Sequence, residues 1–139
     1  MKSRFALSLA ALAAAGFAAA AAAPAAEAGH RECSIIGKFD RNRDGKLNVF
    51  EAKRAGKAAF AAINKDGDRT LEPGEVSQRI GAETFDKYNL IKRKGLDRVE
   101  WSRLVKARFY AANTDGDRTI ECGELKTKAG HRLLAVIWN

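Results

Sequence analysis

The sequence is poor in the residues that most often carry catalysis. Its 139 residues include only two histidines, His30 and His131, and only two cysteines. Both histidines are isolated, and neither a Ser/His/Asp nor a Cys/His set is apparent around them. The length corresponds to one domain, which excludes a multidomain enzyme. We therefore expect a binding protein and not an enzyme.

Charge is absent from a long stretch near the N-terminus. After Lys2 and Arg4 no charged residue occurs before Glu27, and the run between them consists mostly of alanine. A basic start, a weakly apolar stretch and a small-x-small site ending at Ala28 are typical of a secretory signal peptide, which we predict over residues 1–28. The alternative is a retained membrane anchor, because the 22 uncharged residues are long enough to span a bilayer.

Acidic residues are outnumbered, with 17 Asp and Glu against 25 Lys and Arg, for a net charge of +8. Such an excess suggests an anionic partner. Nucleic acid fits poorly, because the chain is predicted to be periplasmic or secreted and lacks a recognition motif. Without residues 1–28 the predicted domain over residues 29–139 keeps 16 acidic residues, and 11 of them lie in three short segments. The acids are therefore concentrated in these segments, whereas the bases are spread over the whole predicted domain.

A twelve-residue pattern occurs four times, over residues 40–51, 64–75, 89–100 and 113–124, which we call loops one to four. Loop one has oxygen-bearing side chains at positions 1, 3 and 5, Gly at 6, an apolar residue at 8 and Glu at 12. This is the spacing of the EF-hand calcium loop, in which alternate positions face a hard cation, position 7 offers its carbonyl and position 12 supplies two oxygens. The sequence therefore predicts cation sites.

Loops one, two and four keep the ligand positions 1, 3, 5, 7, 9 and 12. Loops two and four place Arg69 and Arg118 at position 6, where a positive φ usually calls for Gly, and we expect each to cost about 1 kcal/mol. The predicted metal ligands are Asp40, Asn42, Asp44, Lys46, Asn48 and Glu51 in loop one, Asn64, Asp66, Asp68, Thr70, Glu72 and Glu75 in loop two, and Asn113, Asp115, Asp117, Thr119, Glu121 and Glu124 in loop four.

Loop three keeps the twelve-residue spacing but lacks ligand side chains at two positions. Ile91 and Arg93 stand at two ligand positions, which leaves Asp97 and Glu100 as its carboxylates. Two carboxylates cannot form a shell of six to eight oxygens. We therefore interpret loop three as structural.

Only 12 or 13 residues separate successive loops, enough for one helix of about 18 Å. We predict an all-α fold, a compact EF-hand helical bundle in which single short helices are shared between loops. Consecutive loops then lie at opposite ends of a helix, so loops one and three should share one end and loops two and four the other. The apolar position-8 residues are expected to join paired loops through short two-strand contacts; they are Leu47, Leu71, Leu96 and Ile120.

Apolar residues recur at helical spacing between and after the loops. The segment 76–88 is the weakest, because Gly81 lies inside it. The predicted core residues are Ala52, Ala55, Ala59, Phe60 and Ile63; Val76, Ile80, Phe85 and Tyr88; Trp101, Leu104, Val105, Phe109 and Ala112; and Leu125, Leu133, Leu134 and Ile137.

Export would place Cys33 and Cys122 in an oxidising compartment. Cys33 begins the helix that leads into loop one and should lie at the opposite end of the bundle. The predicted arrangement puts loop four, and with it Cys122, at that end. We therefore expect a disulfide that clamps the N-terminal segment to loop four.

The loop arrangement from about Phe39 onward resembles the lanmodulin family of small exported bacterial EF-hand proteins. The likeness includes the phrase Ala-Arg-Phe-Tyr-Ala-Ala-Asn before loop four and the Gly-Glu-Leu-Lys to Ala-Gly-His-Arg-Leu-Leu ending after it. The resemblance implies a three-helix bundle and a periplasmic cation-binding role. Dockerins, which also repeat a calcium loop plus one helix, are a more distant likeness. Position 2, which is Pro in lanmodulin loops, holds other residues here, so the ion is expected to be Ca²⁺ or a trivalent lanthanide.

A second hypothesis concerns the basic helices, whose charges lie outside the acidic loops. They would dock an acidic periplasmic protein or anionic lipid, with metal ordering the surface, although solvated helix faces would look the same. The basic residues concerned are Lys53, Arg54, Lys57, Arg103, Lys106, Arg108, Lys126, Lys128 and Arg132.

Overall fold

The computed structural model describes residues 33–92 and 94–138, so the predicted signal peptide over 1–28 lies outside the described residues. A helical stretch covers 33–39. The elements that follow are β1 (Leu47–Asn48), α2 (Val49–Ile63), β2 (Thr70–Leu71), α3 (Pro73–Val76), α4 (Ala82–Tyr88), β3 (Leu96–Asp97), α5 (Arg98–Ala112), β4 (Thr119–Ile120), α6 (Cys122–Leu125) and α7 (Lys128–Ile137). The described residues are predominantly helical, as predicted, and contain two small two-stranded sheets.

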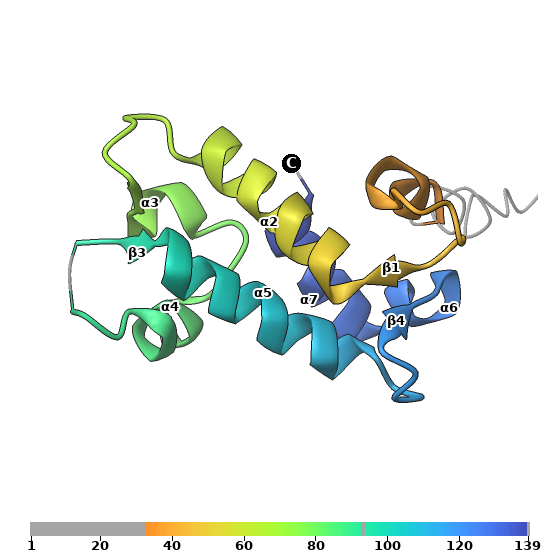
Figure 1. The fold of residues 1–139 in the computed structure, drawn as a ribbon. Helices are drawn as coiled ribbons and strands as arrows, with labels where there is room; N and C mark the ends of the chain where they lie inside the picture. The colour runs from red at the N-terminus through yellow and green to blue at the C-terminus, as the bar shows by residue number, and fades with distance from the viewer. Residues whose placement is uncertain (1–32, 93, 139) are drawn as a thin grey trace, which may run out of the picture.

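Three helices form the centre of the molecule. Helices α2, α5 and α7 each pack against the other two, and Figure 1 shows them side by side with the loops at either end. Trp101 is fully buried there. Its ring makes a T-shaped contact with Phe60 at 6.4 Å between centroids, and its indole N–H donates to the Gly56 carbonyl at 3.0 Å. Every predicted core residue is buried except Tyr88 and Leu134, which pack against the core while partly exposed.

The pairing of the loops differs from the prediction. Strand β1 of loop one pairs with β4 of loop four, and β2 of loop two pairs with β3 of loop three, both antiparallel. Figure 1 shows β1, β4 and α6 at one end of the bundle and β3, α3 and α4 at the other. The expectation that loops one and three share one end, and loops two and four the other, was wrong.

The segment between loops two and three explains this difference. Helix α3 begins within loop two and ends at Val76, and α4 is a separate helix, so no single helix is shared between the two loops. Gly81 is extended at φ −74° and ψ 162° and caps the start of α4, so the chain turns back after Ile80. Two short helices with a turn return loop three to the end at which loop two lies. The 15-residue helices α2 and α5, by contrast, each carry the chain across the bundle, as predicted.

The position-8 residues do join the paired loops. Leu47 lies opposite Ile120, and Leu71 lies opposite Leu96, all four with no exposed surface. Gly95 of loop three passes so close to Leu71 that an added Cβ would lie 2.6 Å from the Leu71 carbonyl oxygen. Each two-strand contact is thus sealed by an apolar pair, which agrees with the predicted contact although the partners are different.

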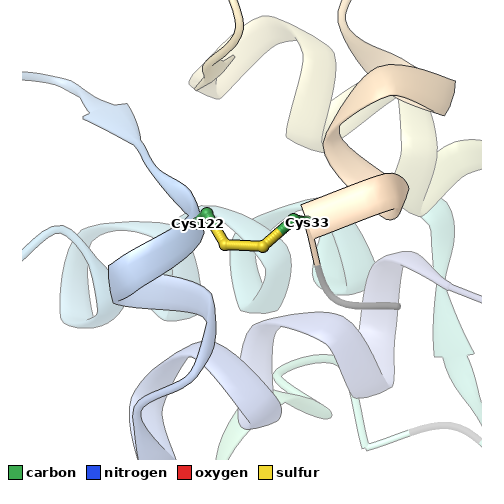
Figure 2. Close-up of a disulfide and its surroundings, with 2 residues drawn as sticks. All are labelled: Cys33 and Cys122. Carbon is green, nitrogen blue, oxygen red and sulfur yellow. A yellow bond between two sulfur atoms is a disulfide. The ribbon is translucent and has the colours of Figure 1, made fainter. Parts of the chain in front are cut away.

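The predicted disulfide is present. Cys33 and Cys122 are bonded across 89 residues of sequence with a Cα–Cα distance of 4.9 Å, and Figure 2 shows the bond joining the N-terminal helical stretch to the start of α6. The geometric reason given for it was wrong, because loops one and four share an end. The helical stretch over 33–39 spans only about 10 Å, so Cys33 stays near loop one and hence near loop four. A disulfide is compatible with a non-cytoplasmic location.

No helix within residues 33–92 and 94–138 combines the length and the apolar character needed to cross a membrane.

Candidate metal centre

The position-12 glutamate of every loop closes that loop through its own carboxylate. One oxygen accepts the backbone N–H of position 2, at 2.6 to 2.8 Å across the four loops. The other oxygen accepts the N–H of position 9, at 3.0 to 3.2 Å. Position 12 is the third residue of the helix that follows, so this second bond satisfies an N–H at the helix start. The four residues are Glu51, Glu75, Glu100 and Glu124.

The same kind of hydrogen bond explains why loop three has kept its two carboxylates. The side chain of Asp97 accepts from the N–H groups of Val99 and Glu100, both at 2.8 Å, while Glu100 accepts from Asp97. This reciprocal arrangement is a capping box, and the Asp-x-x-Glu spacing before an apolar run is its sequence signal. We did not identify this signal from the sequence. The two carboxylates of loop three therefore have a role in starting α5.

In loops one, two and four, polar side chains accept hydrogen bonds from the backbone of their own loop. In loops two and four the position-1 amide oxygen of Asn64 or Asn113 accepts the position-4 N–H, at 2.6 and 2.8 Å. In loop one Asp40 accepts the position-6 N–H of Gly45 at 2.8 Å. These bonds turn the position-1 side chains back over their loops.

Two positions in each of these loops adopt the left-handed conformation, and only one of them is glycine. Loop one has Arg43 at position 4 with φ 58° and Gly45 at position 6 with φ 78°. Loops two and four reverse the order, with Gly at position 4 and Arg69 or Arg118 at position 6, at φ 77° and 71°. The positive φ predicted at Arg69 and Arg118 is therefore confirmed.

Replacing Arg69 or Arg118 by Gly should raise the free energy of unfolding by about 1 kcal/mol each, because Gly adopts a positive φ without steric cost. Urea denaturation midpoints measure the change. Arg41→Gly is the matched control: Arg41 is exposed and not at a positive φ, so its loss should leave stability unchanged or lower. A drop in the midpoint for both position-6 variants would contradict the strain argument.

Loop two brings three predicted ligands together. One oxygen from each of Asp66, Glu72 and Glu75 lies within 4.8 Å of the others, from positions 3, 9 and 12. The Oε2 atom of Glu72 is buried and has no hydrogen-bond partner. Such a buried oxygen without a donor is what a hard cation would satisfy. Within the described residues, this is the group of three carboxylates that converges tightly enough to hold an ion.

The electrostatics of loop two vary from one carboxylate to the next. Burial raises the pKa of Glu72, and the charge of Asp68 adds to the increase. The pKa of Asp68 is lowered, chiefly because it accepts the Thr70 N–H at 2.8 Å and the Thr70 hydroxyl at 2.9 Å. Negative charge is thus held at Asp68 by neighbouring donors and disfavoured at Glu72 by loss of water.

Loop four holds a lysine ammonium among its predicted ligands. Lys46, at position 7 of loop one, lies 3.2 Å from the Asp117 carboxylate and 2.5 Å from that of Glu121. Pairing of β1 with β4 brings the two loops together, so the contact follows from the sheet register. Lys46 had been predicted to contribute only its carbonyl to loop one. No sequence signal pointed to this pairing, because it depends on which loops meet.

The contact between Lys46 and Asp117 favours the charged form of both groups. Hydrogen bonds to Glu121 and then Asp117 raise the pKa of Lys46. The pKa of Asp117 falls to about 2, mainly because the Thr119 hydroxyl and amide donate to it, with Lys46 adding less. Loop four therefore presents a charged Asp117 in nearly all aqueous conditions, and a positive group already lies beside it.

Loop one gathers fewer charges. The Asn42 amide donates to Asp44 at 2.8 Å, and Asp44 accepts the Lys46 N–H at 2.9 Å, while Glu51 is buried and bonded to the backbone. The Asn48 side chain accepts from Phe50 and Glu51 and starts α2. Of the three predicted metal loops, loop two thus has the most convergent carboxylates.

No protein-family model matches this chain, and a search of curated proteins finds no match to it.

Proposed function

We propose that the chain is an exported metal-ion-binding protein whose loops one, two and four are EF-hand sites for Ca²⁺ or a trivalent lanthanide, acting as a buffer, sensor or carrier. The observation that carries the proposal is the convergence of Asp66, Glu72 and Glu75 within 4.8 Å. Hard cations take oxygen ligands, and these three come from the positions that an EF-hand loop uses. The lanmodulin-like loop arrangement and the disulfide support the same role.

Titration of the purified domain over residues 29–139 tests the proposal. Calorimetry and circular dichroism with Ca²⁺ and separately with La³⁺ should give saturable binding with at least one of them. Competition between the two ions then decides which metal is preferred. Absence of heat and of spectral change with both ions would rule the proposal out.

Lys46→Gln should raise the cation affinity of loop four by roughly two- to fivefold, the effect expected from losing one exposed ion-pair competitor. The ammonium that lies beside Asp117 and Glu121 has to leave when a metal ion enters. Amide chemical shifts of residues 113–124 followed through a Ca²⁺ or La³⁺ titration report on this loop alone.

The matched control is Lys65→Gln, which removes the same charge from loop two. It should change the affinity of loop four by less than the Lys46 variant, because Lys65 belongs to the loop pair at the other end of the bundle. Equal effects of the two substitutions would show that only net charge matters.

The second candidate function, docking of an acidic protein or anionic lipid, is favoured by one groove. A hollow of about 430 Å³ between α2 and α5 is bordered by the basic residues Lys53, Arg54, Lys57 and Arg98 and by no acidic residue. Its apolar part is formed by Phe60 and Trp101. A pull-down with and without metal tests it, since a pure metal buffer should retain no partner in either condition.

A further inference from the structure

A cleft of about 680 Å³ lies where α4, α5, α7 and the turn before α4 meet. This volume is in the range of small-molecule sites. Ile80 and Leu104 form its apolar base, and the small side chains of Ala107, Ala111 and Ala129 leave it hollow. The cleft is separate from the four loops, so its occupant need not be a metal ion.

The charges around the cleft are mostly of one sign. Arg79, Lys87, Arg108 and Arg132 line it, against one carboxylate, that of Glu83. In the described part of the chain, none of Lys87, Arg108 and Arg132 forms an ion pair, whereas Lys46 forms two. Three positive groups thus border one concave space without a carboxylate partner of their own.

Arg108 is held in place for binding. Its Nη1 donates to the Arg132 carbonyl at 2.6 Å, which ties α5 to α7 and leaves its other N–H groups available. Burial, helped by the charge of Arg132, lowers the pKa of Arg108, although a guanidinium remains protonated at any ordinary pH. A half-buried guanidinium beside a second one is costly until an anion neutralises the pair. The side chain is therefore preorganised and short of negative charge.

We propose that this cleft binds a small oxyanion of two or more negative charges between Arg108 and Arg132, with Arg79 and Lys87 completing the positive surface. Guanidinium forks match the paired oxygens of phosphates and carboxylates. The concave shape favours a compact ligand over a membrane or an extended acidic chain. This site is independent of the proposed metal function, because it uses none of the loop residues.

Calorimetry on metal-free protein, with pyrophosphate and with citrate as separate probes, tests the proposal. The salt concentration is 0.15 M, at which the Debye length is about 8 Å and distant surface charges are screened. At least one of them should bind saturably with a stoichiometry of one. The double variant R108Q/R132Q should weaken that binding by about tenfold or more. The control R103Q/K106Q removes two exposed charges of α5 outside the cleft and should change it by less than about twofold.

A steric variant provides a second test of the site that does not depend on whether R108Q/R132Q folds. Ala107→Trp places a large side chain at an exposed position of the cleft wall and should abolish binding, while circular dichroism stays that of the parent. A preference for pyrophosphate or for citrate identifies the ligand as a phosphate or a carboxylate. The proposal is overturned if neither probe saturates, or if the control loses as much affinity as R108Q/R132Q.

Discussion

Replacing both Cys33 and Cys122 by serine should lower the free energy of unfolding by about 4 kcal/mol. The unfolded chain regains the conformational entropy that a cross-link over 89 residues removes. The melting temperature should fall by roughly 15 °C or more for a domain of this size. The disulfide holds the N-terminal helical stretch against α6, so this stretch should lose order first. Urea denaturation and calorimetric melting measure the two effects.

The parent protein in excess reductant is the matched control for the cysteine variant. It should unfold at the same midpoint as the double serine variant, because both lack the same bond. Loops two and three pair at the far end of the bundle, so the metal affinity of loop two should be nearly the same in the double serine variant as in the parent protein. A variant within about 1 kcal/mol of the parent would show that the cross-link adds no stability.

Glu124→Gln should remove one bound ion per chain and also weaken the fold. The neutral amide lacks the charge and the second oxygen that a hard cation takes from position 12. It also replaces the carboxylate that accepts the N–H groups of Thr114 and Glu121, at 2.7 and 3.1 Å, which should cost about 1 kcal/mol. Calorimetric stoichiometry gives the first effect and urea denaturation the second.

Loop three supplies the control for that substitution. Glu100 accepts the equivalent N–H groups of Leu90 and Asp97, at 2.6 and 3.0 Å, in a loop that lacks the other ligands. Glu100→Gln should therefore lower stability by a similar amount and leave the number of bound ions unchanged. If Glu100→Gln also removed an ion, or if Glu124→Gln removed none, the assignment of metal loops would be wrong.

Burial was the most predictable property of this chain. Helical periodicity alone placed Phe60, Trp101 and Phe109 in the core, because a residue every third or fourth position must share a face. The positive φ at Arg118 was predictable for a similar local reason, since the loop pattern fixes the backbone at position 6. These properties depend on neighbours in sequence.

The pairing of the loops was not predictable from spacing, because it depends on whether a single helix runs through segment 76–88 or the chain turns within it. A single backbone break at Gly81 decided the matter and moved loop three to the other end of the bundle. The contact of Lys46 with loop four depends on that pairing and was missed with it. The capping role of Glu100 was a different omission, since its signal lies in the sequence.

The C-terminal end of the described chain lies against the helical stretch over 33–39. Phe39 meets the ring of Trp138 edge to face at 5.9 Å between centroids, and the Lys38 ammonium lies 4.2 Å from the centre of that ring. Domains with adjacent ends tolerate circular permutation. A chain opened in the turn before α4 and joined by a short linker after Trp138 would carry the loops in the order three, four, one, two. Loops four and one would then be neighbours in sequence, and loops two and three would become the distant pair.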